Sequence, residues 1–195
     1  MRAERQQRMV CSWAKLMCRP LLASVTMADV AGVLEGLVLV PPPGGDGPLP
    51  PDVPVADLAV AGTYLIPLTD AVRARCHEAA GDTAVADGFY ELTRGVARWA
   101  QELSRDWMVL YVYCEFWAGD GIHAAMAWHR GSVIFGPRFT RSRGETADPP
   151  YRAADGPDMA INAGLRALGI HAAGCVDEFA AIGLGRHRWT SEWES

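Results

Sequence analysis

Residues 107–135 constrain the fold of this chain more than any other stretch, because they contain three strand-like segments separated by two glycine turns. Residues 107–117 and 122–128 alternate between apolar and mixed side chains, which is the two-residue period of a β-strand. The sequence GDG at 119–121 suits the first turn, and RG at 130–131 suits a two-residue hairpin turn with glycine in second place. The stretch therefore predicts an antiparallel β-meander.

The register of the first hairpin decides which of its side chains share a face, since a shift of one residue moves every side chain to the other face. Closure through the three residues 119–121 places Cys114 opposite Met126 and His123 opposite Trp117. Cys114 and His123 then point to opposite faces of the sheet. A nucleophile needs its base within hydrogen-bond reach, so this pairing predicts no catalytic dyad. A closure of two or four residues would reverse the parity.

The even-numbered side chains of the meander form an apolar row that we expect on the core face, because a shift of one residue would bury charge. Cys114 is then a small buried hydrophobe, which is the common fate of a free cysteine. The row consists of Leu110, Val112, Cys114, Phe116, Ile122, Ala124, Met126 and Trp128, and it continues with Val133 and Phe135.

The odd-numbered row combines large aromatic side chains with small alanines and a few charges. One interpretation is that the longest predicted helix or the N-terminal strand packs over this row. The other is an exposed partner-binding surface, since tyrosine and tryptophan with a few charges are typical of interface hot spots. On the second interpretation the anchors are Tyr111, Tyr113, Glu115, Trp117 and His123.

Helices are predicted both before and after the meander in the sequence. Residues 83–104 carry apolar side chains at steps of three and four residues, which predicts the longest helix. A helix is also expected at 70–80, and another over 157–168 with Pro157 at its start and Gly169 after its end. Short strands are expected at 36–40 and 63–69, and a short helical stretch before Gly183.

These elements predict a single α+β domain over residues 27–195. It should contain an antiparallel β-meander of three to five strands, with the helices at 83–104 and 157–168 packed on one face. Residues 41–54 hold seven prolines and should form a loop. Residues 1–26 are expected to be a disordered leader, with Met27 as an alternative start.

The charge of the chain is unevenly distributed. Five Lys and Arg side chains against Glu4 give residues 1–26 a net charge of +4, which leaves −9 for the remainder. An acidic body repels phosphate backbones, so nucleic-acid binding is disfavoured, whereas encounter with a basic protein partner is favoured. No apolar run approaches the roughly 20 residues that cross a bilayer, so no membrane partner is expected.

The five cysteines are scattered and contain no C-x-x-C pair, which predicts a reducing, cytoplasmic location. His171 and Cys175 lie four residues apart, but no second pair has a zinc-site spacing, so no metal site is predicted. The chain contains no P-loop, dinucleotide fingerprint or H-E-x-x-H motif, and we therefore predict no cofactor.

The stretch GLGRHRW at 183–189 concentrates Arg186, His187 and Arg188 beside glycines. Arginine pairs of this kind bind carboxylates or phosphates through bidentate contacts, so the three residues are a candidate anion-binding cluster. The alternative is a solvated turn whose arginines offset nearby glutamates.

Three stretches together carry a resemblance: YCEFWAGDGIHAAMAWHRGSVIFGP, INAGLRALG and DEFAAIGLGRHRWTSEW. They resemble a family of uncharacterised small actinobacterial proteins that ends in a G-L-G-R-H-R-x-T-x-x-W motif. In size and acidity these proteins are similar to toxin-immunity proteins. The resemblance covers about residues 107–193 and implies no catalytic residue.

The sequence as a whole favours a non-enzymatic, protein-binding module, of the kind of an immunity-type inhibitor with a basic partner. A hydrolase or transferase that uses Cys114 or the Arg186–Arg188 cluster is the first alternative. A structural subunit that forms a homo-oligomer is the second.

Overall fold

The computed structural model describes residues 31–45, 47–80, 85–89, 91–117, 120–142 and 149–194; the predictions for residues 1–26 lie outside them. Within the described residues, seven strands form one sheet in the order β2-β3-β1-β4-β5-β6-β7. Neighbouring strands are antiparallel except β6 and β7, which are parallel. The strands are β1 (Gly32–Val40), β2 (Ala56–Asp57), β3 (Tyr64–Pro67), β4 (Met108–Trp117), β5 (Asp120–His129), β6 (Ser132–Ser142) and β7 (Arg152–Ala154). The α+β class is confirmed, although the sheet exceeds the predicted three to five strands.

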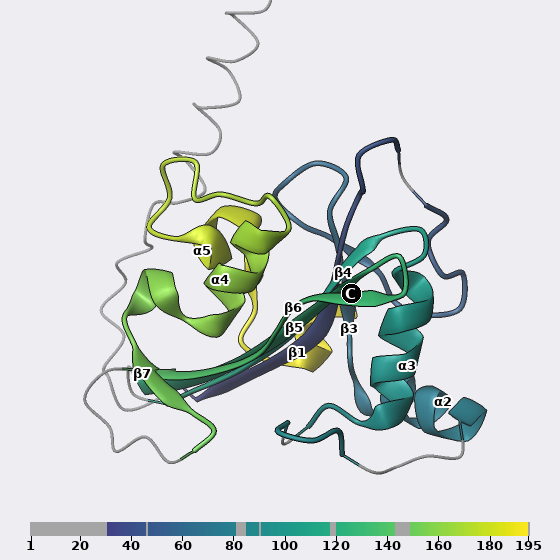
Figure 1. Ribbon diagram of the computed structural model, residues 1–195, viewed down its shortest axis with the longest axis horizontal. Coiled ribbons are helices and arrows are strands. Elements are labelled where there is room, and N and C mark those ends of the chain that lie inside the picture. Colours follow the sequence, from purple (N-terminus) through teal and green to yellow (C-terminus); the bar gives the residue numbers. More distant parts are fainter. Residues whose placement is uncertain are drawn as a thin grey trace, which may run out of the picture.

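Helices cover both faces of this sheet (Figure 1). On one face lie α2 (Asp70–Ala80) and α3 (Arg94–Leu103), and on the other lie α4 (Ala160–Ala167) and α5 (Glu178–Ile182). The prediction that the two main helices share one face is therefore wrong. The reason is that the central strands are apolar on both sides: of the nine residues of β1, eight are buried. A sheet buried on both sides needs a helical layer on each side.

The predicted helix over 83–104 forms only in its second half. Thr93 is the N-cap of α3, and its Oγ1 accepts a hydrogen bond of 3.2 Å from the Val96 N–H. Before it, Val85 forms a β-bridge with Thr93, and Gly88 has a φ of +83°. That angle lies in the left-handed region, which ends a right-handed helix. The apolar residues before Thr93 cover the sheet from a turn rather than from a helix.

The other helices agree better with prediction, although α4 begins at Ala160 and the predicted first residue Pro157 lies in a short 3-10 helix before it. α2 occupies the expected residues 70–80. In α4, the predicted buried residues Ile161, Leu165 and Leu168 are at most 4% exposed. Gly169 and Gly183 both have left-handed backbones just after their helices, as the sequence predicts.

Three shorter elements complete the comparison. Residues 41–45 and 47–54 contain neither helix nor strand, as their prolines predict. The 130–131 turn has positive φ at both positions, as a two-residue hairpin turn of this type requires.

Val133, predicted on the core face, is instead 49% exposed. The pairing of β5 with β6 shifts register twice between Ala125 and Trp128, and these irregularities break the alternation on which that prediction depended. No helix in the described residues is long and apolar enough to span a bilayer.

Candidate functional site

Cys114 and His123 are directly opposite each other in the β4–β5 ladder. The pairing continues to Trp117 and Asp120, so each residue of β4 is opposite the residue of β5 three positions before its predicted partner. Residues directly opposite in an antiparallel pair share a face, and the prediction that Cys114 and His123 lie on opposite faces is therefore wrong. The prediction assumed that one face of the hairpin is exposed to solvent. Both faces are buried, so the apolar pattern cannot show which register is correct.

The surroundings of this pair are apolar. Cys114 is fully buried, and the His123 ring stacks on Phe179 of α5 with centroids 5.9 Å apart. Nδ1 of His123 is buried and has no hydrogen-bond partner. Both side chains lie beneath the layer formed by α4 and α5.

Burial keeps both groups of the pair neutral. It raises the pKa of Cys114 to about 12 and lowers the pKa of His123 to about 4. A reactive cysteine requires the opposite arrangement, in which a nearby imidazolium lowers the thiol pKa. Cys114 and His123 are therefore neighbours, as in a catalytic dyad, but they lack the thiolate and the imidazolium that a dyad needs. We describe the pair as core packing.

The five predicted partner-binding residues do not form one surface. Tyr111 is fully buried and Tyr113 is 7% exposed, contrary to the surface interpretation, and they belong to the core under α2 and α3. His123 belongs to the opposite face, and the Trp117 side chain lies outside the described residues. Glu115 is exposed. The alternative that the sequence left open, a helix over this row, describes Tyr111 and Tyr113 correctly.

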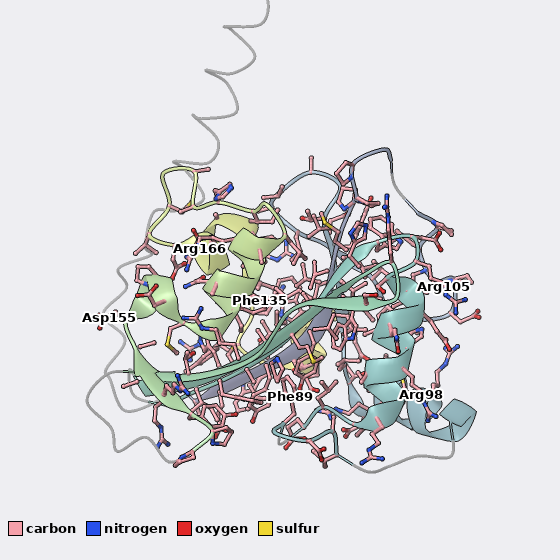
Figure 2. The ribbon with its side chains drawn as sticks, viewed as in Figure 1. Phe89, Arg98, Arg105, Phe135, Asp155 and Arg166 are labelled. Atoms are coloured by element: carbon pink, nitrogen blue, oxygen red, sulfur yellow. The ribbon has the colours of Figure 1, made fainter. Side chains whose placement is uncertain are left out.

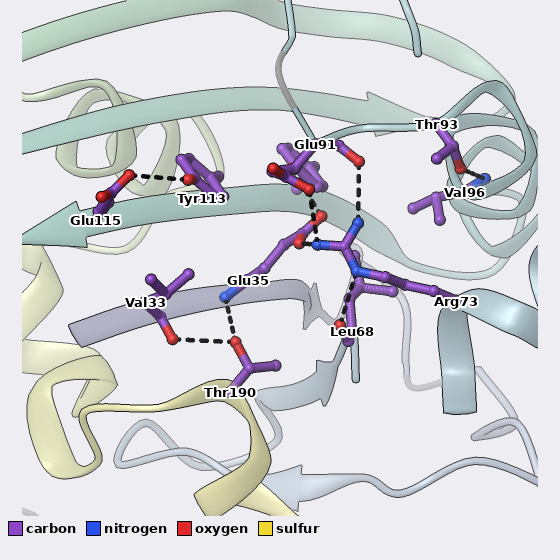
Figure 3. A network of polar contacts seen from close by, with 11 residues as sticks. Val33, Glu35, Leu68, Arg73, Glu91, Thr93, Val96, Tyr113, Glu115 and Thr190 are labelled. Atoms are coloured by element: carbon purple, nitrogen blue, oxygen red, sulfur yellow. Dashed lines mark hydrogen bonds and ion pairs between the residues drawn. The ribbon is translucent and has the colours of Figure 1, made fainter. Parts of the chain in front are cut away.

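A buried ionic network lies beneath α2, and sequence analysis missed it (Figure 3). The Glu35 carboxylate is 1% exposed and forms an ion pair with Arg73 of α2. Tyr111 Oη donates to Glu35 Oε1 at 2.8 Å. Arg73 also lies 3.5 Å from the Glu91 carboxylate and donates to the Leu68 carbonyl at 3.2 Å. The only hint in the sequence is that Glu35 is a single charge within an apolar strand, which must be paired to be buried.

This network keeps Tyr111 in its neutral form. Burial raises the pKa of Tyr111 well above its ordinary value, and the positive charge of Arg73 opposes that effect only in part. The hydroxyl is thus a permanent donor to Glu35, and the group ties β1, β4 and α2 together. Glu35, Arg73 and Tyr111 do not line the clefts at residues 50–53 and 155–158.

Glu91, Tyr113 and Glu115 form a second polar group, which we call the acidic rim. Tyr113 Oη donates to Glu115 Oε2 at 3.2 Å, and the Glu91 side chain is 47% exposed. Burial raises the pKa of Tyr113, and the negative charges of Glu115 and Glu91 raise it further. Both carboxylates therefore act on the same hydroxyl and create a negative potential at the surface.

The predicted anion-binding cluster packs against the C-terminal turn. Arg186 lies over the Trp193 ring, 4.7 Å from its centroid, and donates to the Asp57 carbonyl at 3.0 Å. His187 meets the same ring edge to face at 4.8 Å. The backbone N–H of Arg188 donates to Glu192 at 2.8 Å. These contacts give Arg186 and His187 a packing role, and anion binding stays a prediction.

The same C-terminal segment fastens to β1. Thr190 Oγ1 accepts the Glu35 N–H at 2.9 Å and donates to the Val33 carbonyl at 3.1 Å. Trp189 forms a parallel bridge with Val33. β3 pairs with β1 only over residues 36–39, so the C-terminal segment takes the place beside β1 where β3 has ended.

Two clefts in the described part of the molecule are large enough to hold a small ligand. One, of about 580 Å³, lies between residues 50–53 and the helices α2 and α3. The other, of about 770 Å³, lies between β6, β7 and residues 155–158. Neither is lined by Cys114 or His123.

The described residues contain no group of three His, Cys, Asp or Glu side chains that could hold a metal ion. Cys76 and Cys114 are free thiols, and both are buried. Cys175 is disulfide-bonded, which the scattered cysteines of the sequence did not predict. Comparisons with models of protein families, with curated proteins and with solved structures find no match for this chain.

Proposed function

We propose that this chain is a non-enzymatic protein-binding module whose acidic body docks on a basic partner, in the manner of an immunity-type inhibitor. The observation that carries the proposal is the acidic rim, where the exposed Glu115 accepts a hydrogen bond from Tyr113 and the Glu91 side chain is 47% exposed, on a body with a net charge of −9 over residues 27–195. A negative surface of this kind steers a basic protein into encounter and raises the association rate.

The acidic rim offers a defined contact for a cationic side chain. Glu115 is exposed and already oriented by the Tyr113 hydroxyl, so less side-chain entropy is lost when it binds. Glu91 is held from below by Arg73, which leaves part of its carboxylate accessible. An arginine or lysine of the partner that contacts Glu115 would be bound by a charge-assisted hydrogen bond.

Inhibition in this proposal is steric. The chain needs no reacting group, because a bound acidic body would cover the basic active surface of the partner. This agrees with the neutral state of Cys114 and His123, the closest approach to a catalytic pair suggested by the sequence.

The test uses the protein product of the neighbouring reading frame as the partner. Binding should weaken steeply with added salt, because the encounter is electrostatic. Glu115→Lys should weaken it by about tenfold or more, which corresponds to about 1.4 kcal/mol. Asp106→Lys is the matched control, since Asp106 is exposed but precedes the opposite end of β4.

Calorimetric titration of the wild type and both variants separates the outcomes. Unchanged affinity for Glu115→Lys, or equal losses for the two variants, would contradict a docking site at the acidic rim. Turnover of a substrate by the isolated chain would contradict the non-enzymatic class.

A further inference from the structure

The cleft beside α3 is built from two facing helix stripes and a proline wall. α2 contributes Val72, Arg75 and Cys76, and α3 contributes Gly95, Arg98, Trp99 and Glu102. Steps of three and four residues place each set along one side of its helix. Residues 50–53 form the third wall. The volume of about 580 Å³ falls within the range of small-molecule sites, roughly 300–1,000 Å³.

The floor of this cleft is apolar and its walls are held in place. Val72 and Cys76 are 2% and 9% exposed, and Trp99 packs on the same core cluster. The proline wall is anchored at one side by Trp107, whose Nε1–H donates to the Pro48 carbonyl at 3.2 Å. Arg75 donates to the Asp52 carbonyl at the other side. A wall fixed before binding loses little entropy when a ligand enters.

The charges around the cleft are balanced, although the chain is acidic. Two cationic side chains, Arg75 and Arg98, and two acidic ones, Asp52 and Glu102, line the cleft. The Arg75 and Asp52 charges are 3.9 Å apart, and their side chains are 53% and 75% exposed. Such an exposed pair is screened by water and contributes little, so a ligand group can replace the side chain of either partner at small cost. A ligand with one charge would meet repulsion as well as attraction, whereas one with both charges complements the cleft.

We infer that this cleft binds a zwitterionic small molecule with an apolar body, an apolar or aromatic α-amino acid. Its carboxylate would contact the arginines, its ammonium group would contact the carboxylates, and its side chain would lie against Trp99 and Val72. The site is independent of the acidic rim, so the docking proposal stands or falls separately.

The test compares three ligands by calorimetric titration of the full chain. L-phenylalanine carries both charges, N-acetyl-L-phenylalanine lacks the ammonium group, and L-phenylalaninamide lacks the carboxylate. We expect phenylalanine to bind about tenfold more tightly than either blocked form, since each loses a charge-assisted contact. Equal affinity for a blocked form, or no heat with phenylalanine at millimolar concentration, overturns the inference.

Variants and a chemical probe locate the site. Arg98→Gln should weaken phenylalanine binding about fivefold to tenfold, and Trp99→Phe should keep it. Arg105→Gln is the control: Arg105 lies beyond the end of α3 and does not line the cleft (Figure 2). Bound phenylalanine should also slow alkylation of Cys76, followed by mass spectrometry of its peptide. Binding without protection of Cys76 places the ligand elsewhere and overturns the assignment.

Discussion

At the residue scale, the buried charge of Glu35 shows most clearly how the fold depends on single contacts. Its carboxylate is 1% exposed and has Arg73 and Tyr111 as partners. The pair adds little net stability compared with an apolar core, but its loss is costly, because a lone buried charge remains. The network therefore fixes the position of α2 on the sheet, because Arg73 of α2 must reach Glu35 of β1.

Removal of one partner should cost much more stability than removal of both, because it leaves a lone buried charge. Arg73→Gln should lower the free energy of unfolding by about 3 kcal/mol, since Glu35 keeps its charge without its cation. Arg73→Gln combined with Glu35→Gln should recover part of that loss. Arg75→Gln, two residues along the same helix and with an exposed side chain, should change it by less than about 0.5 kcal/mol. Urea unfolding measures all four proteins, and equal losses at positions 73 and 75 would contradict the network.

The half-buried imidazole of His123, whose Nδ1 is inaccessible to water, predicts a dependence of stability on pH. Its pKa is about 4 in the fold and about 6.5 in an unfolded chain, so the unfolded state takes up a proton first as pH falls. Stability is complete above about pH 6.5 and declines between pH 6.5 and 4, by up to about 3 kcal/mol. His123→Phe should remove this part of the decline, whereas His171→Gln, which alters an exposed histidine, should retain it. Identical pH profiles for the wild type and His123→Phe would contradict the assignment.

At the element scale, local chemistry predicted the glycine helix ends and the 130–131 turn well, but it failed for the turn at 119–121, where Asp120 and Gly121 belong to β5, and for strand register. Gly183 and the 130–131 turn need left-handed backbones, and that requirement is visible in a single residue. The helix predicted over 83–104 failed because a stripe of apolar residues also describes a turn that packs on a sheet. The register of β4 with β5 failed because it depends on which faces are covered, which is not a local property.

The C-terminal segment makes a prediction at this scale. Thr190→Val keeps the shape of the side chain but leaves the Glu35 N–H and the Val33 carbonyl without their partner. The free energy of unfolding should fall by about 1–3 kcal/mol, whereas Thr190→Ser, which retains the hydroxyl, should lose less than half of that. Thermal unfolding of both variants provides the comparison. Equal losses would show that the methyl group, not the hydroxyl, fastens the segment.

At the scale of the whole molecule, one mixed sheet with helices on both faces explains both the successes and the failures. The α+β class followed from composition and element pattern. The distribution of α3 and α4 over two faces could not be predicted, because the central strands are apolar on both sides and neither side is marked as solvent. β7 has three residues and pairs in parallel, and no periodicity identifies a strand of that length.

The reactivity of Cys114 in the folded protein tests the central claim, that its pairing with His123 is core packing and not a catalytic dyad. The measurement is the alkylation rate of Cys114 in the native chain against pH, followed by mass spectrometry of its peptide. We expect modification no faster than global unfolding permits, and abolished by conditions that stabilise the fold. Rapid labelling of the folded chain at neutral pH that is lost in His123→Phe would contradict this account. It would favour the alternative of an enzyme that uses Cys114 as its nucleophile.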